Sequence, residues 1–123
     1  MNTRAFLLAF AIALLTAGFS ATAQKAPAPR VEITTVEIAQ IPVEARVTIA
    51  LIRKGGPYPY AKDGAIFGNR EEILPRERRG YYREYTVKTP GVRTRGARRI
   101  IWGAGGEFYY TDDHYNHLRR IHE

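Results

Sequence analysis

The chain has 123 residues, with 19 Lys and Arg against 12 Asp and Glu for a formal net charge of +7, and it has no cysteine. That length allows one domain, because a second core would have too few residues to bury. A chain without cysteine excludes a disulfide framework, a thiolate zinc site, an iron–sulfur cluster and a cysteine nucleophile. The charge favours a polyanionic partner, either nucleic acid or an anionic membrane surface.

The first 23 residues have the pattern of a secretory signal peptide. One positive charge in Met1–Arg4 precedes the apolar run Ala5–Leu15, and Ala21-Thr22-Ala23 supplies the small residues that a signal peptidase requires. A membrane-spanning helix would need about 20 apolar residues, more than this run contains. We therefore expect cleavage near Ala23, a secreted, extracellular protein, and no stable membrane association.

After the signal peptide, residues 24–34 form a short Ala/Pro-containing tether and residues 35–123 form the domain. The stretch Val31–Ile41 alternates loosely and is closed by Pro42. The next stretch, Val43–Lys54, fits both a strand period and a helical stripe. Pro42 at its start and Gly55-Gly56-Pro57 at its end favour a helix.

The rest of the chain predicts a loop followed by short strands. Gly55–Gly68 is punctuated by glycine and proline, which is typical of an ordered loop. Aromatic and β-branched runs then alternate with turn signals at Tyr81–Lys88, Arg98–Gly103, Glu107–Thr111 and His114–Ile121. Such runs predict an antiparallel sheet. One helix followed by several strands predicts an α+β fold in which the helix covers one sheet face.

Three kinds of ionisable side chain gather in the second half of the chain. The seven-residue segment 93–99 contains four arginines, namely Arg93, Arg95, Arg98 and Arg99. By themselves they could form a solvated basic loop. Glu84 lies inside an aromatic strand, where a glutamate usually just faces solvent, and His114 follows two aspartates. RNA phosphodiester cleavage needs these types together.

In that chemistry a base removes the 2′-hydroxyl proton and an acid protonates the departing 5′-oxygen. Cations meanwhile stabilise the charge that builds on the phosphoryl oxygens. None of these steps requires a metal ion, and we expect neither a metal site nor another cofactor.

Three separated segments carry a resemblance to a known family. They are Tyr58–Glu71 (YPYAKDGAIFGNRE), Gly80–Ile101 (GYYREYTVKTPGVRTRGARRII) and Tyr109–Tyr115 (YYTDDHY). In this order they resemble the small secreted microbial guanyl-specific ribonucleases, the family that includes barnase, and the similarity runs from about Thr35 to Ile121. The resemblance implies one main helix packed on a twisted antiparallel β-sheet, the microbial ribonuclease fold, and hence a helical Pro42–Lys54.

The resemblance also implies roles for single residues. The general base would be Glu84, in the G-Y-Y-R-E-Y stretch, and the general acid would be His114, in the D-H-Y motif. The residues around the scissile phosphate would be Arg95, Arg99, Arg70 and Tyr115.

The guanine-binding loop would be Phe67, Gly68, Asn69, Arg70 and Glu71, whose backbone amides and Glu71 carboxylate contact the base edge. A carboxylate can accept hydrogen bonds from guanine N1–H and the exocyclic amine together, a pairing that adenine cannot offer. An aromatic such as Phe67 can stack on the base. Gly68 replaces a polar side chain often found there, but the position contributes mainly backbone, so guanine preference should survive.

Two features depart from the family pattern. Some relatives carry a disulfide that ties the first strand to the C-terminal end, whereas here Glu37 occupies the first position, which lowers stability rather than activity. Arg76–Arg79 (RERR) is unusually basic and could add general RNA affinity. His117 and His122 match no catalytic motif, and we expect both on the surface.

The implied function is a guanine-specific endoribonuclease that cleaves single-stranded RNA 3′ of G through a 2′,3′-cyclic phosphate without a metal, and we expect a monomer. The same nuclease used as an antibacterial toxin would need an acidic, barstar-like protein inhibitor as a partner. A non-catalytic secreted basic RNA-binding protein is the alternative. It explains the charge, but it does not explain why Glu84 and Glu71 lie within the proposed anion-binding surface.

Overall fold

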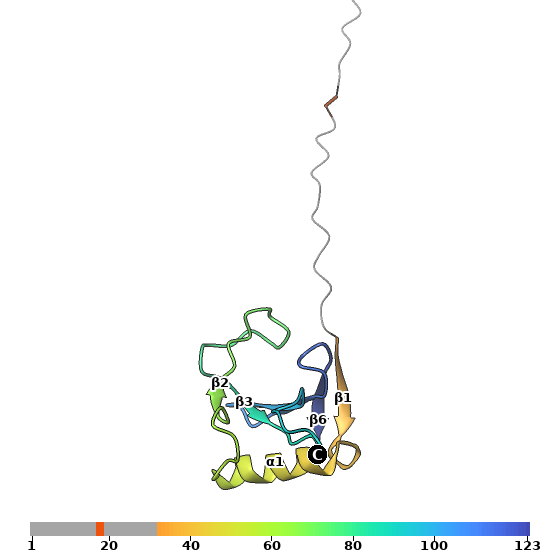
Figure 1. Ribbon diagram of the computed structural model, residues 1–123. Coiled ribbons are helices and arrows are strands. Elements are labelled where there is room, and N and C mark those ends of the chain that lie inside the picture. Colours follow the sequence, from red (N-terminus) through yellow and green to blue (C-terminus); the bar gives the residue numbers. More distant parts are fainter. Residues whose placement is uncertain (1–16, 19–31) are drawn as a thin grey trace, which may run out of the picture.

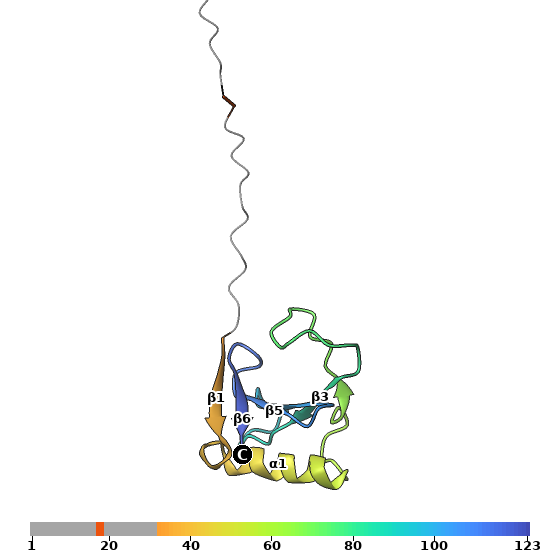
Figure 2. The same cartoon turned by 180° about the vertical axis from the view of Figure 1, so that it is seen from behind.

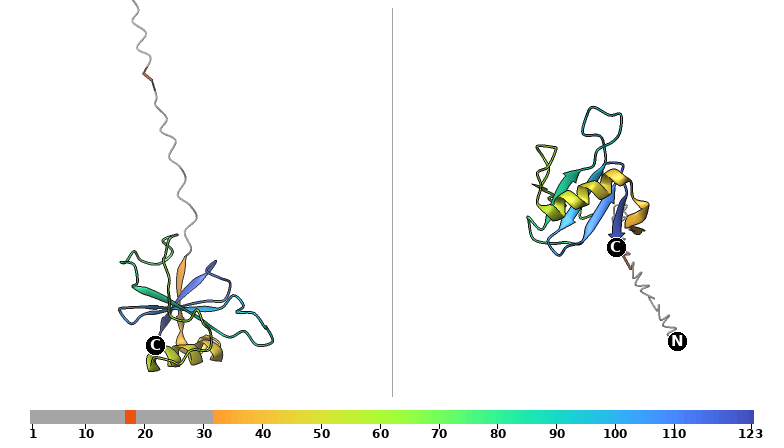
Figure 3. Two further views of the ribbon diagram at one scale, coloured as in Figure 1. Left: turned by 60° about the vertical axis from the view of Figure 1, so that its left-hand side comes forward. Right: turned by 90° about the horizontal axis from the view of Figure 1, so that it is seen from below.

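The structure is a computed structural model that describes residues 17–18 and 32–123. Apart from residues 17–18, the predicted signal peptide therefore lies outside the described residues, as do its cleavage site and most of the tether. Helix α1 (Val43–Lys54) lies across one face of a six-stranded sheet (Figures 1 and 3). The strands are β1 (Ile33–Glu37), β2 (Ala65–Ile66), β3 (Tyr82–Thr86), β4 (Arg99–Gly103), β5 (Phe108–Thr111) and β6 (Leu118–His122). A 3-10 turn, η1 (Ile38–Gln40), joins β1 to the helix.

The sheet has the order β1-β6-β5-β4-β3-β2 and is mixed. Strands β2 to β6 pair antiparallel, whereas β1 runs parallel to β6, with Ile33 opposite Leu118. The predicted α+β fold with one main helix is confirmed, but the sheet is not wholly antiparallel. Because α1 carries the chain from β1 across the sheet to its far edge, the last strand returns beside the first in the same direction.

The predicted helix is confirmed, and it begins one residue after Pro42. Glu44 lies in its first turn, where a negative charge is favourable. Ala45 and Ile49 are buried, whereas Val43 is 56% exposed, so the helical stripe and not the strand period describes this segment. Gly55 ends the helix with φ 85°, a left-handed conformation that glycine adopts without steric cost.

Side chains of alternate strand residues divide between two apolar layers. The layer under α1 contains Val36, Tyr85, Val87, Ile100, Phe108, Tyr110 and Ile121. The layer on the opposite face, here called the open face, contains Leu74, Tyr82, Ile101, Tyr109 and Leu118. In Figures 1 and 2, α1 lies below the sheet, and the β2–β3 and β5–β6 loops rise on the other side. Loops rather than a helix therefore border the open face.

Two parts of the strand prediction need correction. The expected strand His114–Ile121 is wrong in its first half, because β6 is Leu118–His122 and His114 and Tyr115 have φ of 52° and 74°. Left-handed residues cannot continue a strand. The expected loop Gly55–Gly68 contains the short strand β2, which pairs with β3. The remaining three predicted strands are confirmed, with ends that shift by up to two residues.

Within the described ranges, none of the helices has the length and apolar character needed to cross a membrane.

Candidate active site

The open face carries two adjacent rows of side chains from β3, β4 and β5. The register places Thr86 opposite Arg99 and Arg99 opposite Thr111. In the neighbouring row, Glu84 lies opposite Ile101. Because side chains two residues apart point to the same face of a strand, Glu84 and Arg99 lie on one surface. The sheet thus brings together a predicted base and a predicted phosphate-binding arginine.

The Glu84 carboxylate is held by two neighbours. The Tyr115 hydroxyl donates a hydrogen bond of 2.9 Å to Oε2, and Arg95 Nη2 lies 3.7 Å from Oε1. Arg95 is itself anchored, because its Nε donates to Thr86 Oγ1 at 3.0 Å. Arg95 Nη2 is buried and has no hydrogen-bond acceptor among the described residues. One N–H group beside the carboxylate is thus available to a further acceptor.

A tight turn determines how Arg95 reaches this position. Gly96 has φ 65°, and a Cβ there would lie 2.7 Å from Thr89 Oγ1, so only glycine fits. Arg93 lies in the bend that precedes this turn and is exposed, away from the buried guanidinium of Arg99. Of the arginines on either side of this turn, Arg95 lies next to the Glu84 carboxylate and Arg99 is buried, whereas Arg93 is exposed.

Arg99 is a buried cation, with 4% of its surface exposed. Its Nη1 donates to the carbonyl oxygens of Gly96 at 3.0 Å and Arg98 at 2.8 Å. No carboxylate of residues 32–123 lies within 4.0 Å of it. Burial, and next the positive charge of Arg95, lower the pKa of Arg99. Because a buried charge without a counterion is costly, this arrangement favours binding of an anion.

His114 and Tyr115 occupy a left-handed turn that the β5 end holds in place. The backbone N–H of His114 donates to the carbonyl oxygen of Ala97, and the N–H of Tyr115 donates to Thr111 Oγ1, both at 3.0 Å. The His114 side chain is exposed, and its ring centroid lies 5.1 Å from that of Tyr115. Burial, together with the adjacent Glu84 charge, raises the pKa of Tyr115 well above its ordinary value. Tyr115 therefore stays a hydrogen-bond donor.

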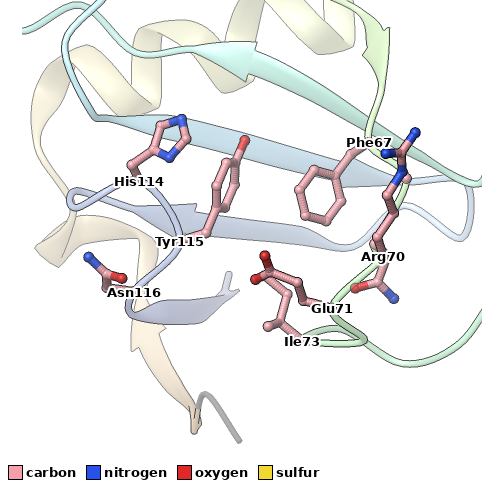
Figure 4. A pocket seen from close by; sticks show the side chains of 9 residues that line it. Phe67, Arg70, Glu71, Ile73, His114, Tyr115 and Asn116 are labelled. Atoms are coloured by element: carbon pink, nitrogen blue, oxygen red, sulfur yellow. The ribbon is translucent and has the colours of Figure 1, made fainter.

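A pocket of about 390 Å³ lies between this turn and the β2–β3 loop (Figure 4). Its lining residues are Phe67, Gly68, Asn69, Arg70, Glu71, Ile73, His114, Tyr115 and Asn116. The ring centroids of Phe67 and Tyr115 are 5.0 Å apart. In Figure 4 the Glu71 carboxylate points toward the space beside these rings. Tyr115 both lines the pocket and donates to Glu84, so it forms the boundary between the pocket and the charged face.

Asn69 shapes the part of the β2–β3 loop that lines the pocket, residues 67–73, here called the pocket loop. This residue has φ 49°, and its side-chain amide donates to the carbonyl oxygen of Leu74 at 2.9 Å and accepts from the Leu74 N–H at 3.0 Å. Leu74 is buried in the open-face layer, which anchors the loop. The Asn69 side chain is thus used within the loop, and Glu71 remains free to face a ligand.

Two threonines that sequence reasoning did not identify support the site. Thr86 Oγ1 accepts from Arg95, and Thr111 Oγ1 accepts from the Tyr115 backbone. Asp63 in turn accepts the backbone N–H of Thr86 at 2.7 Å. The two-residue spacing from Glu84 to Thr86 is visible in the sequence. Thr111 needed the strand register, since it lies opposite Arg99 only in the folded sheet.

Within residues 17–18 and 32–123, no cluster of three or more histidine and acidic side chains is arranged to hold a metal ion. His114 and His117 are three residues apart, a spacing found in metal sites, but the His117 side chain is exposed and pairs with Asp113. His122 is also exposed and lies 3.2 Å from Glu37, so both expected surface histidines are confirmed as such.

Comparison with known proteins identifies the class. A family model described as ribonuclease matches residues 24–122. Guanyl-specific ribonuclease St of Saccharopolyspora erythraea is 58% identical over 84 residues, which is 68% of this chain and 83% of that protein. Guanyl-specific ribonuclease Sa of Kitasatospora aureofaciens is 57% identical over 82 residues, which is 66% of this chain and 85% of that protein.

The fold agrees with these matches. A structure of ribonuclease Sa2 with mononucleotides superimposes with a TM-score of 0.73 at 46% identity, covering 75% of this chain and 96% of that one. The class is therefore an α+β ribonuclease, an enzyme that cleaves RNA. The chain belongs to the family of microbial guanyl-specific ribonucleases, as its three sequence motifs indicated.

Proposed function

We propose that this protein is a secreted endoribonuclease that cleaves single-stranded RNA on the 3′ side of guanine, without a metal ion, through a 2′,3′-cyclic phosphate. The observation that carries the proposal is the Glu84 carboxylate, held by Tyr115 and Arg95 on the same sheet surface as the buried Arg99, which has no carboxylate within 4.0 Å among residues 32–123. Its relatives support guanine as the base, because ribonuclease Sa2 has been solved with guanosine-2′-cyclophosphate and with 3′-GMP.

In the first step Glu84 takes the proton of the ribose 2′-hydroxyl. Oε2 already accepts from Tyr115, whereas Oε1 accepts no hydrogen bond from the described residues, so Oε1 is the atom that receives this proton. The 2′-oxygen then bonds to phosphorus as the bond to the 5′-oxygen breaks. His114 is exposed to solvent, and its ring centroid lies 5.1 Å from that of Tyr115. It donates its proton to the departing 5′-oxygen.

The two arginines stabilise the charge that develops on the phosphoryl oxygens. Arg95 Nη2 is buried and lacks an acceptor in the described part of the chain, and Arg99 is buried without a counterion. Both are in place before the substrate arrives, which is what makes such donors effective in a transition state. Hydrolysis of the cyclic phosphate reverses the roles: His114 takes a proton from water and Glu84 returns one to the 2′-oxygen.

Guanine recognition falls to the pocket loop. Glu71 lines the pocket, and its carboxylate can accept from both guanine N1–H and the exocyclic amine. Phe67 offers a ring face for stacking. A protein that only bound RNA would gain nothing from Glu84, because this carboxylate repels phosphate and does not line the base pocket. The roles of general base for Glu84 and guanine-binding carboxylate for Glu71 account for both residues.

The decisive experiment incubates residues 24–123 with GpC, ApC, CpC and UpC in EDTA and follows the products by chromatography. We expect guanosine 2′,3′-cyclic phosphate from GpC and little cleavage of the other three. Loss of activity in EDTA, or equal cleavage after all four bases, would contradict the proposal.

Variants of the two proton-transfer groups test the mechanism. Glu84→Gln and His114→Ala should each lower kcat by roughly 10²-fold or more. Glu44→Gln on α1 and His122→Ala at the end of β6 are matched controls that should retain activity. Wild-type kcat/KM should follow a bell in pH, and Glu84→Gln should lose only its acidic limb. Loss of the alkaline limb instead would mean that the base and the acid are interchanged.

A further inference from the structure

Two consecutive residues of the candidate site lie in the left-handed region of backbone conformation. His114 has φ 52° and Tyr115 has φ 74°. Residues with a Cβ are disfavoured there, the more so when they are bulky, and such a turn persists only where its surroundings hold it. The proposed chemistry depends on this turn, because His114 is the proposed acid and the Tyr115 hydroxyl donates to Glu84. Whatever holds the turn therefore bears on the rate.

The Asp113 carboxylate joins the two ends of this turn. Its Oδ1 accepts a hydrogen bond of 3.0 Å from the Thr111 hydroxyl and one of 2.9 Å from the backbone N–H of His117. Its Oδ2 contacts Nδ1 of the His117 ring. Thr111 is the last residue of β5, and His117 is the residue before β6. One side chain thus closes the whole connection between the two strands.

The same carboxylate decides which way the Thr111 hydroxyl is polarised. An ionised carboxylate only accepts hydrogen bonds, and a hydroxyl has a single proton to donate. Because Thr111 donates that proton to Asp113, its oxygen is left to accept, and it accepts the backbone N–H of Tyr115 at 3.0 Å. Burial opposes ionisation of Asp113, but hydrogen bonds from His117 and Thr111 prevail and lower its pKa, so the carboxylate is charged at neutral pH.

The His114 imidazole has no side-chain anchor of its own. Its backbone N–H donates to the carbonyl oxygen of Ala97, but none of the hydrogen bonds within residues 32–123 involves its exposed ring. The ring is placed by its backbone and by the ring of Tyr115, whose centroid lies 5.1 Å away. Both depend on the left-handed turn.

We propose that Asp113 is the positioning residue for the general acid: with Thr111 it holds the turn that presents the His114 imidazole to the leaving group. The inference rests on the proposed function, in which His114 gives its proton to the departing 5′-oxygen. Asp113 touches neither the substrate nor the proton, and it acts on the rate only through His114.

The leaving group distinguishes a misplaced acid from a general loss of structure. In GpC the departing 5′-oxygen needs a proton, because an alkoxide is a poor leaving group. In the p-nitrophenyl ester of guanosine 3′-phosphate the departing p-nitrophenolate is a weak base that leaves without one. Both substrates present the same guanine, the same phosphate and the same 2′-hydroxyl to the base. Only a defect in the acid slows the first more than the second.

Asp113→Ala should lower kcat for GpC by roughly 10- to 100-fold, the effect of misplacing a reacting group by up to about 1 Å. It should lower kcat for the p-nitrophenyl ester by less than about threefold, because that reaction needs no acid. Circular dichroism confirms that each variant is folded at the assay temperature. If Asp113→Ala does not fold, Asp113→Asn replaces it, since its side-chain oxygen still accepts from Thr111, and the same substrate dependence should appear with a smaller loss.

Two further variants test the path through Thr111. Thr111→Val keeps the shape of the side chain but removes the hydroxyl, and it should slow GpC more than the ester. Thr111→Ser restores the hydroxyl and should recover most of the rate. The double variant Asp113→Ala/Thr111→Val should be no slower than the slower single variant, because both remove one connected set of bonds.

Asp112→Ala is the matched control. Asp112 is the neighbouring carboxylate, is exposed and forms no ion pair with residues 32–123, so the change in charge is the same and the turn is untouched. Both substrates should be cleaved at the wild-type rate.

Equal losses on the two substrates would overturn the inference, because Asp113 would then support the fold or Glu84 rather than the acid. An unchanged kcat for GpC in Asp113→Ala would overturn it as well. The proposed function has a separate test. If His114→Ala itself slowed both substrates equally, the acid would be wrongly assigned, and absence of GpC cleavage by the wild-type protein would refute the nuclease activity.

Discussion

Arg99 should be a residue that the enzyme retains for function at the expense of stability. It is buried to 4% exposure, its pKa is lowered by burial and by Arg95, and no carboxylate in the described chain pairs with it. Taking a charge out of water costs several kcal/mol even after relaxation. Arg99→Met removes that charge and keeps an apolar side chain of comparable length.

The expected gain is reduced by two lost hydrogen bonds. Arg99 donates to the carbonyl oxygens of Gly96 and Arg98, and each such bond contributes about 1 kcal/mol net. We therefore expect Arg99→Met to raise the free energy of unfolding by about 1 kcal/mol, or about 5 °C in Tm for a domain of this size. Because the guanidinium stays charged, the gain should be the same throughout the neutral pH range.

Urea and thermal unfolding of wild type, Arg99→Met, Arg99→Lys and Arg99→Ala give the comparison. Lysine keeps a charge that is more strongly hydrated, and alanine leaves a cavity, so both should be less stable than the methionine variant. All three should lose about 10²-fold or more in kcat. A saturating guanine nucleotide such as 3′-GMP, at about 100 times its Kd, should add roughly 2.7 kcal/mol to wild type. The methionine variant should gain much less at the same concentration.

The reasoning would be refuted if Arg99→Met lowered the free energy of unfolding by more than about 1 kcal/mol, the worth of an ordinary hydrogen bond. Arg99 would then be a structural cation whose bonds to the turn outweigh its desolvation. Full activity of the methionine variant would equally remove it from the phosphate site.

Three further predictions follow from single contacts. Glu71→Gln should lower the ratio of GpC to ApC cleavage by about a hundredfold, because two charge-assisted hydrogen bonds to guanine are weakened; an unchanged ratio would remove this carboxylate from base recognition. Tyr115→Phe should lower kcat about tenfold by removing the hydroxyl bonded to Glu84 while leaving guanine preference intact, and a loss of preference instead would place the hydroxyl in the base pocket. For Asp113, burial opposes ionisation, but hydrogen bonds from His117 and Thr111 prevail and lower its pKa below 3.8. The ionised Asp113 carboxylate therefore stabilises the folded protein at pH values above the pKa of Asp113 in the unfolded chain. This stabilisation is lost as the pH falls through the lower pKa of Asp113 in the folded protein. Asp113→Asn should therefore destabilise at pH 7 and approach wild type in acid, as measured by urea unfolding; a constant difference would contradict the assignment.

Local signals were sufficient for most of the secondary structure. The helix could be bounded because Pro42 and Gly55 act within a turn of its ends, whatever the rest of the chain does. The strands β3, β4 and β5 were predicted because each is an aromatic or β-branched run bounded by turn residues, and both signals are local. The turn at His114 and Tyr115 was not predicted, because its left-handed geometry depends on bonds to Ala97 and Thr111.

The pairing of strands that lie far apart in the sequence could not be predicted from local patterns either. The parallel pair β1–β6 joins Glu37 to His122, 85 residues apart, and no local pattern specifies which edge a strand will find. The signal peptide and its cleavage near Ala23 remain sequence predictions, since all of this segment except residues 17–18 lies outside the described residues.

The sequence by itself determined the chemical groups of the site: a glutamate at an alternating strand position, clustered arginines, a histidine and a glycine-containing loop with one acidic residue. Only the tertiary structure decided which of these groups are buried and which lie beside an opposite charge. The sheet register buries Arg99 between Thr86 and Thr111 without a carboxylate, while Arg95 lies beside Glu84. The reason is physical: identity and spacing are local, whereas burial and charge compensation depend on every segment that folds around a residue.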